Sequence, residues 1–294
     1  MEITPAMVKD LRERTGAGMM ECKKALSEAG GDLDAAVEAL RKRGAASADK
    51  KAGRIAAEGV VLVVVAPDRR TGVLIEVNCE TDFVAKDGNF RAFASAVADL
   101  VLHGVAADVE SLKTMKLKDG ASVEDTRKAL VGKIGENIAV RRFTILRAPA
   151  GAQVAGYAHG ARIGTLVVSS GGRDDLGRDL AMHVAASRPQ YVERAQVPAE
   201  AVAREREIYL AQAQGSGKPA NVLEKIVEGK LQKYLAEITL LGQPFVKDPD
   251  ITVAKLLQQE GASVAEFARY EVGEGLEKRA DDFAAEVMAQ VQKG

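Results

Sequence analysis

The chain has 294 residues, 47% of them hydrophobic, and its 41 Lys and Arg residues against 42 Asp and Glu residues give a net charge of −1. This composition is ordinary for a globular protein of about two domains, and it lacks the electropositive surplus that binding to a phosphate backbone requires. No apolar run approaches the ~20 residues that cross a bilayer. We therefore expect neither direct binding to nucleic acid nor an association with a membrane.

The first ten residues lack the basic start and apolar block of a secretory signal, so we expect a cytoplasmic protein. Residues 1–54 predict a three-helix docking module of the ubiquitin-associated type, followed by a linker. Thr4 can cap a helix that begins at Pro5 and ends near Gly16, a second helix is expected over residues 18–29, and Asp32 can cap a third. The connector at residues 44–54 is rich in Ala, Gly and Ser, which indicates a flexible tether.

A short basic stretch lies at the start of this connector and contains Arg41, Lys42 and Arg43, with Lys50 and Lys51 further on. We interpret these cations as side chains that interact favourably with the dipole at the end of a helix and that keep a linker exposed to solvent.

Residues 55–146 predict a first core subdomain. The segments GVVLVVVAP and TGVLIEVNCE favour a β-hairpin around a short turn, and helices are expected over residues 88–105 and 122–135. Residues 147–273 predict a second, related subdomain. A β-rich block at residues 136–146 leads into QVAGYAHGARIGTLVVSS, which favours another hairpin, and a helix is expected over residues 174–186. We expect an α+β fold in which the two core subdomains contain antiparallel sheets.

Within the second subdomain, residues at about 198–240 predict a helical-hairpin arm, with helices over residues 200–214 and 220–239. The pattern fits both an arm that projects from the core and a pair of helices that packs flat on it. The role of the arm also stays open: it could serve self-association, contact with a partner, or neither. A helix at residues 252–259 and a strand at residues 266–272 follow. Residues 274–294 predict a C-terminal helix whose buried face carries Phe283, Val287 and Val291.

The sequence carries no pattern typical of an active site. Cys22 and Cys79 are far apart, and the histidines His103, His159 and His183 are scattered, so no metal ligand set is indicated. The segment GSGKP at residues 215–219 resembles a phosphate-binding loop, but Pro stands where Ser or Thr would bind magnesium. We expect no catalysis, no metal and no cofactor.

The segment NCETDFVAKDG, residues 78–88, places Asp82 and Phe83 between an apolar strand and a helix. Such a pair can present a carboxylate and an apolar wedge to a partner's surface. A lone Phe after a strand is more often a core residue, and both interpretations remain open from the residues alone.

Seven ordered segments carry a family resemblance over essentially the full chain. They are TGAGMMECKKAL, NCETDFVAKDGNF, KIGENIAVRR, HGARIGTLV, AMHVAASRP, GQPFV and EVGEGLEK, at residues 15–26, 78–90, 133–142, 159–167, 181–189, 242–246 and 271–278. The chain resembles the bacterial translation elongation factor Ts family, the guanine nucleotide exchange factors of elongation factor Tu.

The resemblance implies a partner, elongation factor Tu in its GDP-bound and nucleotide-free forms, and a set of contact residues. Thr81, Asp82, Phe83 and Val84 match the segment that enters the partner beside its magnesium site. Arg12, Met19 and Met20 match contacts on the partner's nucleotide-binding domain, and His159 matches a contact on its distal β-domain. The resemblance thus implies an exchange factor that promotes GDP release without covalent chemistry and holds the nucleotide-free form until GTP binds.

Several alternatives remain beside this interpretation. Met19 and Met20 also suit the core of a small bundle, although adjacent helical residues point about 100° apart and only one can be fully buried. His159 also suits a simple hairpin turn. At the level of function, the alternatives are a nascent-chain or ubiquitin-like binding module, suggested by the N-terminal helices, and an enzyme with an unrecognised pocket.

Overall fold

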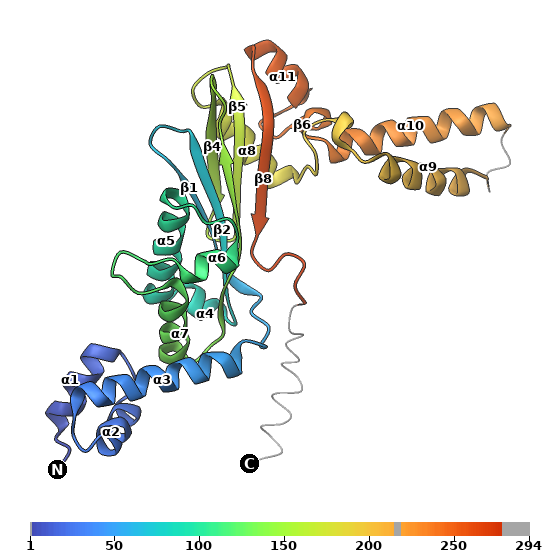
Figure 1. Ribbon diagram of the computed structural model, residues 1–294. Helices are drawn as coiled ribbons and strands as arrows, with labels where there is room; N and C mark the ends of the chain where they lie inside the picture. Colours follow the sequence, from blue (N-terminus) through green and yellow to red (C-terminus); the bar gives the residue numbers. More distant parts are fainter. Residues whose placement is uncertain (1, 215–218, 278–294) are drawn as a thin grey trace. The chain divides into compact units, whose positions relative to one another are not determined.

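The computed structural model describes residues 2–214 and 219–277 and confirms an α+β fold (Figure 1). The chain forms two compact units that alternate along the sequence. Unit 1 comprises Met1–Val60, Glu76–Arg142 and Glu271–Gly294, and unit 2 comprises Val61–Ile75 and Phe143–Tyr270. The chain therefore leaves unit 1 twice and returns to it twice. The division into four domains, at residues 1–54, 55–146, 147–273 and 274–294, stays a prediction.

Three helices open unit 1, namely α1 (Pro5–Thr15), α2 (Met19–Glu28) and α3 (Leu33–Lys51). Thr4 and Asp32 cap α1 and α3 with side-chain hydrogen bonds, as their positions predict. The first helix ends at Gly16, whose φ of 67° lies in the left-handed region that glycine adopts without strain. The helices bury a common apolar cluster that includes Leu11, Cys22 and Leu26.

The connector predicted at residues 44–54 is wrong for most of its length, because α3 continues to Lys51. Gly44 is the first residue of this predicted connector. In the structure it is the site where α3 meets α7 (Val123–Ile134), and its α-carbon lies 2.8 Å from where a Cβ on Gly132 would be. Alanine-rich sequence on both sides of Gly44 favours helix, and packing against α7 offsets the cost of the glycine.

The remaining helices of unit 1 are α4 (Asp82–Ala85), α5 (Gly88–His103), α6 (Val109–Thr114) and α7. The predictions for α5 and α7 are confirmed, whereas α6 lies in a stretch where we expected no element. Helix α7 begins at Ser122, whose hydroxyl accepts a hydrogen bond from the Asp125 amide at 3.0 Å, and ends at the left-handed Gly135. This sharp end sets the direction in which the next strand starts.

A three-stranded sheet in the order β1-β2-β3 contains β1 (Glu58–Val65), β2 (Thr71–Cys79) and β3 (Ile138–Arg147). β1 and β2 are joined by five residues, which confirms the predicted hairpin. Gly59 is required in β1, because a Cβ there would lie 2.2 Å from the carbonyl oxygen of Val77. The second strand delivers the chain directly to α4.

Unit 2 contains a second sheet in the order β4-β5-β8, formed by β4 (Ala152–His159), β5 (Ile163–Ser170) and β8 (Ser263–Glu271). β4 and β5 pair antiparallel from Ala152 opposite Ser170 to His159 opposite Ile163, which confirms the hairpin predicted at HGARIG. Helix α8 (Leu176–Ser187) packs on β4 and β5 and contributes Leu176, Leu180, Ala181 and Val184 to this core.

The segment after α8 completes the core of unit 2. It comprises two short 3-10 helices, η1 (Arg194–Gln196) and η2 (Leu240–Gly242), with β6 (Pro244–Phe245), β7 (Asp248–Thr252) and α11 (Val253–Glu260). His183 is buried here: its Nε2 lies 2.9 Å from Gln243 Oε1, and its Nδ1 accepts a hydrogen bond from the Val246 amide at 3.1 Å. Burial lowers the pKa of His183 despite the hydrogen bond to Gln243, so this histidine is a neutral structural residue.

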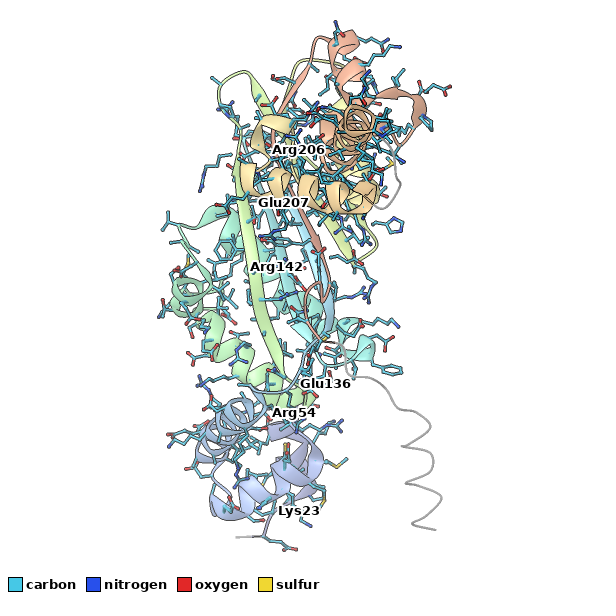
Figure 2. All side chains as sticks on the ribbon, turned by 90° about the vertical axis from the view of Figure 1, so that its right-hand side faces the viewer. Lys23, Arg54, Glu136, Arg142, Arg206 and Glu207 are labelled. Carbon is cyan, nitrogen blue, oxygen red and sulfur yellow. The ribbon has the colours of Figure 1, made fainter. Side chains whose placement is uncertain are left out.

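The predicted arm is present as two helices, α9 (Ala199–Gln214) and α10 (Ala220–Ile238), which lie side by side (Figures 1 and 2). They have an apolar cluster of their own that includes Val197, Leu231 and Leu235, and Arg206 pairs with Glu228 at 2.6 Å across the two helices. The helical hairpin is thus confirmed, and its role stays open.

Residues 272–277 follow β8 as a turn without helix, so the start predicted at residue 274 is not observed. The remainder of the predicted C-terminal helix, with Phe283, Val287 and Val291, lies outside the described residues. None of the helices that the structure describes combines the length and apolar character needed to cross a membrane.

Candidate partner-binding site

The segment with Asp82 and Phe83 forms α4, a single helical turn at the end of β2. Thr81 is its N-cap, and the Thr81 hydroxyl accepts a hydrogen bond from the Val84 amide at 3.3 Å. Val84 is buried beneath the turn, whereas the side chain of Phe83 is 80% exposed. The structure therefore excludes the interpretation of Phe83 as a core residue. An exposed phenylalanine on a short anchored turn is typical of a partner contact.

Asp82 lies beside Phe83 and is also exposed. Its carboxylate accepts a hydrogen bond from Lys86 at 2.6 Å, and this bond lowers the pKa of Asp82. The Lys86 ammonium also lies 6.0 Å from the centre of the Phe83 ring. The sequence did not single out Lys86, although its i, i+4 spacing from Asp82 was a usable signal. The exposed turn thus presents an ionised carboxylate, a cation and an aromatic ring together.

Glu136, which lies between the end of α7 and the start of β3, holds this turn (Figure 2). Its carboxylate accepts hydrogen bonds from the amide of Glu80 (3.1 Å), the amide of Thr81 (3.0 Å) and the hydroxyl of Thr81 (2.7 Å). Hydrogen bonds to an ionised acceptor are about twice as strong as neutral ones. Glu136 therefore fixes the N-cap from which Asp82 and Phe83 project.

Glu80 makes the reciprocal contact. Its carboxylate accepts a hydrogen bond from the Asn137 amide at 2.6 Å and lies 3.4 Å from the guanidinium of Arg54. Asn137 in turn donates to the backbone carbonyl of Arg54 at 2.8 Å. The sequence does not indicate this role of Glu80, because its partner Asn137 lies 57 positions further along the chain. Each of the two glutamates binds backbone amides of the other's segment, which locks the end of β2 to the start of β3.

Cys79 completes the base of the turn and is fully buried. Its thiol donates a hydrogen bond to the Thr81 carbonyl at 3.2 Å. Burial, reinforced by the nearby Glu136 carboxylate, raises the pKa of Cys79 to about 12. The thiol stays protonated at neutral pH, so Cys79 acts as packing and as a donor rather than as a nucleophile.

Met19 and Met20 begin α2 in unit 1, and their side chains are 61% and 77% exposed. The alternative in which they fill the core of the bundle is therefore wrong for both residues, since Cys22 and Leu26 take the buried positions of this helix. Arg12 is exposed on α1. Two adjacent exposed methionines form an adaptable apolar surface of the kind that binds partners.

His159 is placed in unit 2, whereas the other seven candidate residues belong to unit 1. It is the last residue of β4, is exposed, and lies with its Nδ1 at 3.3 Å from the hydroxyl of Tyr157. The turn that follows is made by other residues, so the hairpin does not require a histidine at this position.

Comparison with known proteins finds relatives that match the part of the chain containing these candidate residues. The family model described as Elongation factor TS matches residues 80–274. Proteins named Elongation factor Ts match nearly the whole chain: those of Thioalkalivibrio sulfidiphilus and Methylococcus capsulatus are 60% and 58% identical over 292 residues, and one of Legionella pneumophila is 51% identical over 290 residues. In each case the match covers 99% of this chain and 99% of the relative.

The chain belongs to the elongation factor Ts family. The resemblance inferred from seven short segments is thereby confirmed, and the chain is a translation elongation factor. The family model begins at Glu80 and so includes the α4 turn and His159, while the full-length relatives also cover the helices that carry Arg12, Met19 and Met20.

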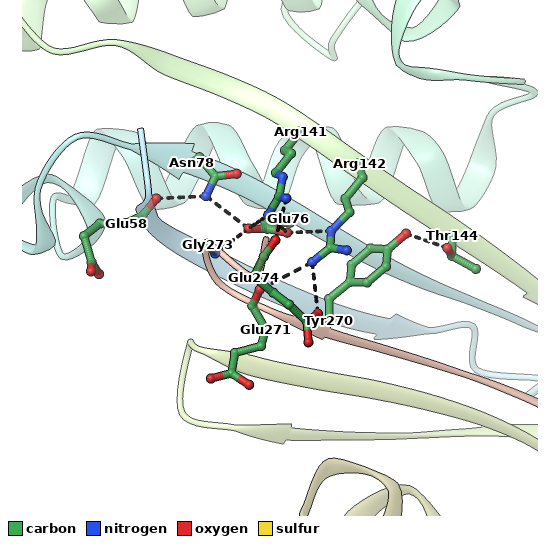
Figure 3. Close-up of polar contacts among 10 residues, drawn as sticks. All are labelled: Glu58, Glu76, Asn78, Arg141, Arg142, Thr144, Tyr270, Glu271, Gly273 and Glu274. Carbon is green, nitrogen blue, oxygen red and sulfur yellow. Dashed lines mark hydrogen bonds and ion pairs between the residues drawn. The ribbon is translucent and has the colours of Figure 1, made fainter. Parts of the chain in front are cut away.

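This elongation factor Ts contains a second polar network that the sequence did not reveal (Figure 3). Glu76 is fully buried in β2, and its carboxylate accepts hydrogen bonds from the guanidinium groups of Arg141 (3.0 Å) and Arg142 (2.7 Å) and from the Gly273 amide (2.8 Å). Burial alone would raise the pKa of Glu76, but the hydrogen bonds from Gly273, Arg142, Asn78 and Arg141 together lower it. The network ties the segment after β8 to the sheet of unit 1.

Metal binding has no visible support in the part of the chain that the structure describes. Among residues 2–214 and 219–277, no group of three or more His, Cys, Asp or Glu side chains is arranged to hold a metal ion.

Proposed function

We propose that this elongation factor Ts binds elongation factor Tu in its GDP complex and accelerates GDP release through the α4 turn, then holds the nucleotide-free form until GTP binds. One observation carries the proposal: an 80% exposed Phe83 projects from a turn that Glu136 braces. Folding gains nothing from an exposed phenylalanine, whereas an interface gains from an aromatic anchor held in one position.

The mechanism follows from how a bound nucleotide is held. The phosphates of GDP depend on Mg²⁺ and on backbone groups around them, so a wedge that displaces the elements beside the ion weakens nucleotide binding. Phe83 supplies the apolar volume of this wedge. Asp82 supplies a carboxylate that competes for polar contacts near the ion. No bond is made or broken, and the factor acts as a competing ligand rather than as an enzyme.

Linkage sets the preference for the nucleotide-free partner. If the exchange protein lowers the affinity of elongation factor Tu for GDP by a given factor, then GDP lowers the affinity of elongation factor Tu for the exchange protein by the same factor. The factor therefore binds nucleotide-free elongation factor Tu most tightly, and GTP releases it in the same way. This cycle needs no cofactor and operates in the cytoplasm.

The other candidate residues serve as binding contacts away from the wedge. Arg12, Met19 and Met20 contact the partner's nucleotide-binding domain, and their exposure supports this role. His159 contacts the partner's distal β-domain, and its place at an exposed strand end in unit 2 is compatible with a contact separate from the wedge. A partner held at several sites keeps the wedge at a high effective concentration.

The proposal is tested by measuring release of a fluorescent GDP analogue from elongation factor Tu with catalytic amounts of this protein. The wild type is expected to accelerate release, and Phe83→Ala is expected to lose about 30-fold in exchange rate, as for the loss of a central aromatic anchor. Val105→Ala is the matched control, because Val105 is also an exposed apolar residue of unit 1.

The outcomes separate function from mechanism. Acceleration that Phe83→Ala leaves intact would keep the function and reject the wedge. A folded wild type that does not accelerate release would reject exchange and favour a binding module instead.

The arm formed by α9 and α10 is a candidate for self-association. Ile208, Leu210 and Val222 are exposed apolar residues on these helices. Sedimentation equilibrium of the full chain checks this role: a dimer that Ile208→Glu dissociates would support it, and a wild-type monomer at tens of micromolar would reject it.

A further inference from the structure

Two hollows that are open to solvent lie on either side of Ala129 and Lys133 of α7 in unit 1. The first has a volume of about 470 Å³ and lies among α1, α2, α3 and α7. The second has a volume of about 440 Å³ and lies among α5, α7 and residues 117–119. Thr15, Ala129 and Lys133 line both hollows. The two hollows therefore adjoin one another, and we call the combined surface the α7 groove.

The first half of the α7 groove is cationic. Its charged lining consists of one acid, Glu21, and five cations, which are Arg14, Lys24, Arg41, Arg43 and Lys133. Arg14 pairs with Asp10 at 2.9 Å, and Arg43 pairs with Glu28. Within residues 2–214 and 219–277, no carboxylate lies at ion-pair distance from Lys24, Arg41 or Lys133. Three cations thus remain available for an anionic ligand.

The second half of the groove is mainly apolar. Its lining includes Ala92, Phe93 and Ala96 of α5, Leu117, and Leu130 of α7. Lys133 stands between the halves, with its ammonium 3.1 Å from the side-chain oxygen of Asn89. A ligand that follows the groove therefore meets positive charge first and apolar surface next.

The groove is preformed by close backbone packing. Gly132 of α7 meets the α-carbon of Gly44 so closely that a Cβ on Gly132 would lie 2.8 Å from it. The Lys133 side chain covers Gly16, where an added Cβ would lie 2.6 Å from the Lys133 Cε. These contacts place α3 and the end of α1 directly against α7, so a ligand does not have to assemble the surface on binding.

The position of Arg41 also calls for an explanation other than the helix dipole. The sequence suggested that the basic stretch sits at a helix end, but α3 continues for ten residues beyond Arg41 and ends at Lys51. The dipole acts only within the last turn, so it stabilises Lys50 and Lys51 and not Arg41. Arg41 is exposed on the wall of the groove instead.

We propose that the α7 groove docks an acidic amphipathic helix of a partner protein. Its length and openness suit a chain segment, whereas a small molecule is held in a cavity that encloses most of its surface. Acidic side chains of such a helix would pair with Lys24, Arg41 and Lys133, and its apolar residues would cover the half lined by Ala92 and Leu117. Single-stranded nucleic acid fits less well, because the aromatic ring in the groove, Phe93, is buried and offers no stacking face.

The test uses the full chain and a fluorescein-labelled helical peptide built from Glu and Leu at amphipathic spacing, read by fluorescence anisotropy. No elongation factor Tu is present, so the result is independent of nucleotide exchange. The wild type is expected to bind the peptide, and higher salt is expected to weaken binding. Lys24→Glu/Arg41→Glu and Ala92→Glu are each expected to weaken binding about tenfold or more, through repulsion in one half and a buried charge in the other.

Matched controls separate the groove from net charge. Lys42→Glu/Lys50→Glu makes the same change in charge on α3 outside the groove, and Ser95→Glu adds a charge on α5 outside it. Both are expected to bind like the wild type. Absence of peptide binding, or equal loss in the control variants, would overturn the proposal.

A location measurement on the wild type guards against variants that fold poorly. Amide chemical-shift changes caused by the peptide are expected to centre on α7 and its neighbours, and changes centred elsewhere would overturn the proposal. An oligonucleotide of equal charge that bound as tightly, with the same pattern across the variants, would replace the acidic helix by nucleic acid.

Discussion

At the scale of single residues, the candidate site combines a side chain that folding leaves exposed with a side chain that holds it. Phe83 is exposed, whereas Phe90 and Phe93 on α5, the helix that follows α4, are buried. The sequence could identify Asp82 and Phe83 from a motif. It could not identify Glu136 as their support, because the hydrogen bonds from Glu80 and Thr81 connect residues 55 and 56 positions apart.

Glu136→Gln is expected to slow nucleotide exchange about tenfold while the protein stays folded. Glutamine keeps the shape of the side chain but loses its charge. One of the two carboxylate oxygens is replaced by an NH2 group, which cannot accept the hydrogen bonds that Glu80 and Thr81 donate, and the cap of α4 is weakened. The measurement is GDP-analogue release together with thermal unfolding. Glu110→Gln is the matched control, since Glu110 is exposed on α6 and pairs only with Lys113 in the described structure.

A double-mutant cycle separates positioning from a general loss of structure. If Glu136 acts through Phe83, then Glu136→Gln should cost almost nothing further in a Phe83→Ala background. Additive losses in exchange rate would instead mean that Glu136 contributes independently of the aromatic ring.

At the scale of elements, the crossing of α3 and α7 depends on two glycines with unequal roles. A Cβ on Gly132 would lie 2.8 Å from the α-carbon of Gly44, whereas a Cβ on Gly44 would find its nearest atom at 3.7 Å. Both residues are inside helices, where alanine is otherwise preferred by about 1 kcal/mol. The two positions therefore respond to the same substitution in opposite directions.

Gly132→Ala is expected to lower the free energy of unfolding by about 1–3 kcal/mol, because backbone must shift to admit the methyl group. Gly44→Ala is expected to raise it by about 0.5–1 kcal/mol, because ordinary contact distances leave the helix-propensity gain intact. Urea unfolding of both variants measures the difference. Equal effects of the two substitutions would show that α3 and α7 do not pack as closely as the structure has them.

The same crossing shows how far sequence reasoning reaches. Helix ends marked by local chemistry were predicted well, as with Thr4 and Asp32, because a cap involves neighbouring residues. The connector expected to begin at Gly44 is helix instead, because α3 packs closely against Gly132 of α7, and the composition of residues 44–54 gives no sign of that contact. The reciprocal contacts of Glu80 and Glu136 were missed for the same reason, since they depend on how β2 and β3 are aligned.

At the scale of the whole chain, unit 1 is closed by residues that lie far apart in sequence. The chain enters unit 2 after Arg142 and comes back at Glu271, and the Gly273 amide then donates to Glu76, 197 positions earlier. Gly273 has a φ of 73°, and a Cβ there would lie 2.3 Å from the carbonyl oxygen of Ala57. Arg141 also donates to the carbonyl of Glu274 at 2.6 Å. A single buried carboxylate thus organises the return of the chain.

The stability of this closure is expected to depend on pH through Glu76. Its pKa in the folded protein is lowered from the ordinary value of 4.5, so its stabilisation is complete above the unfolded pKa and is lost as the pH falls through the folded pKa. Glu76→Gln is expected to cost about 3 kcal/mol at pH 7, because two partly buried guanidinium groups each lose a charged partner. The difference from the wild type should shrink as the pH falls below 4.5 and through the lowered pKa of Glu76 in the folded protein, where the native carboxyl becomes protonated as well. Urea unfolding between pH 7 and pH 3 measures this convergence.

Glu38→Gln is the control for this measurement. Glu38 also has a lowered pKa, but it is exposed and pairs with Lys42 on the surface. A gap between wild type and Glu76→Gln that stayed constant down to pH 3 would mean that the charge of Glu76 does not hold the returning segment.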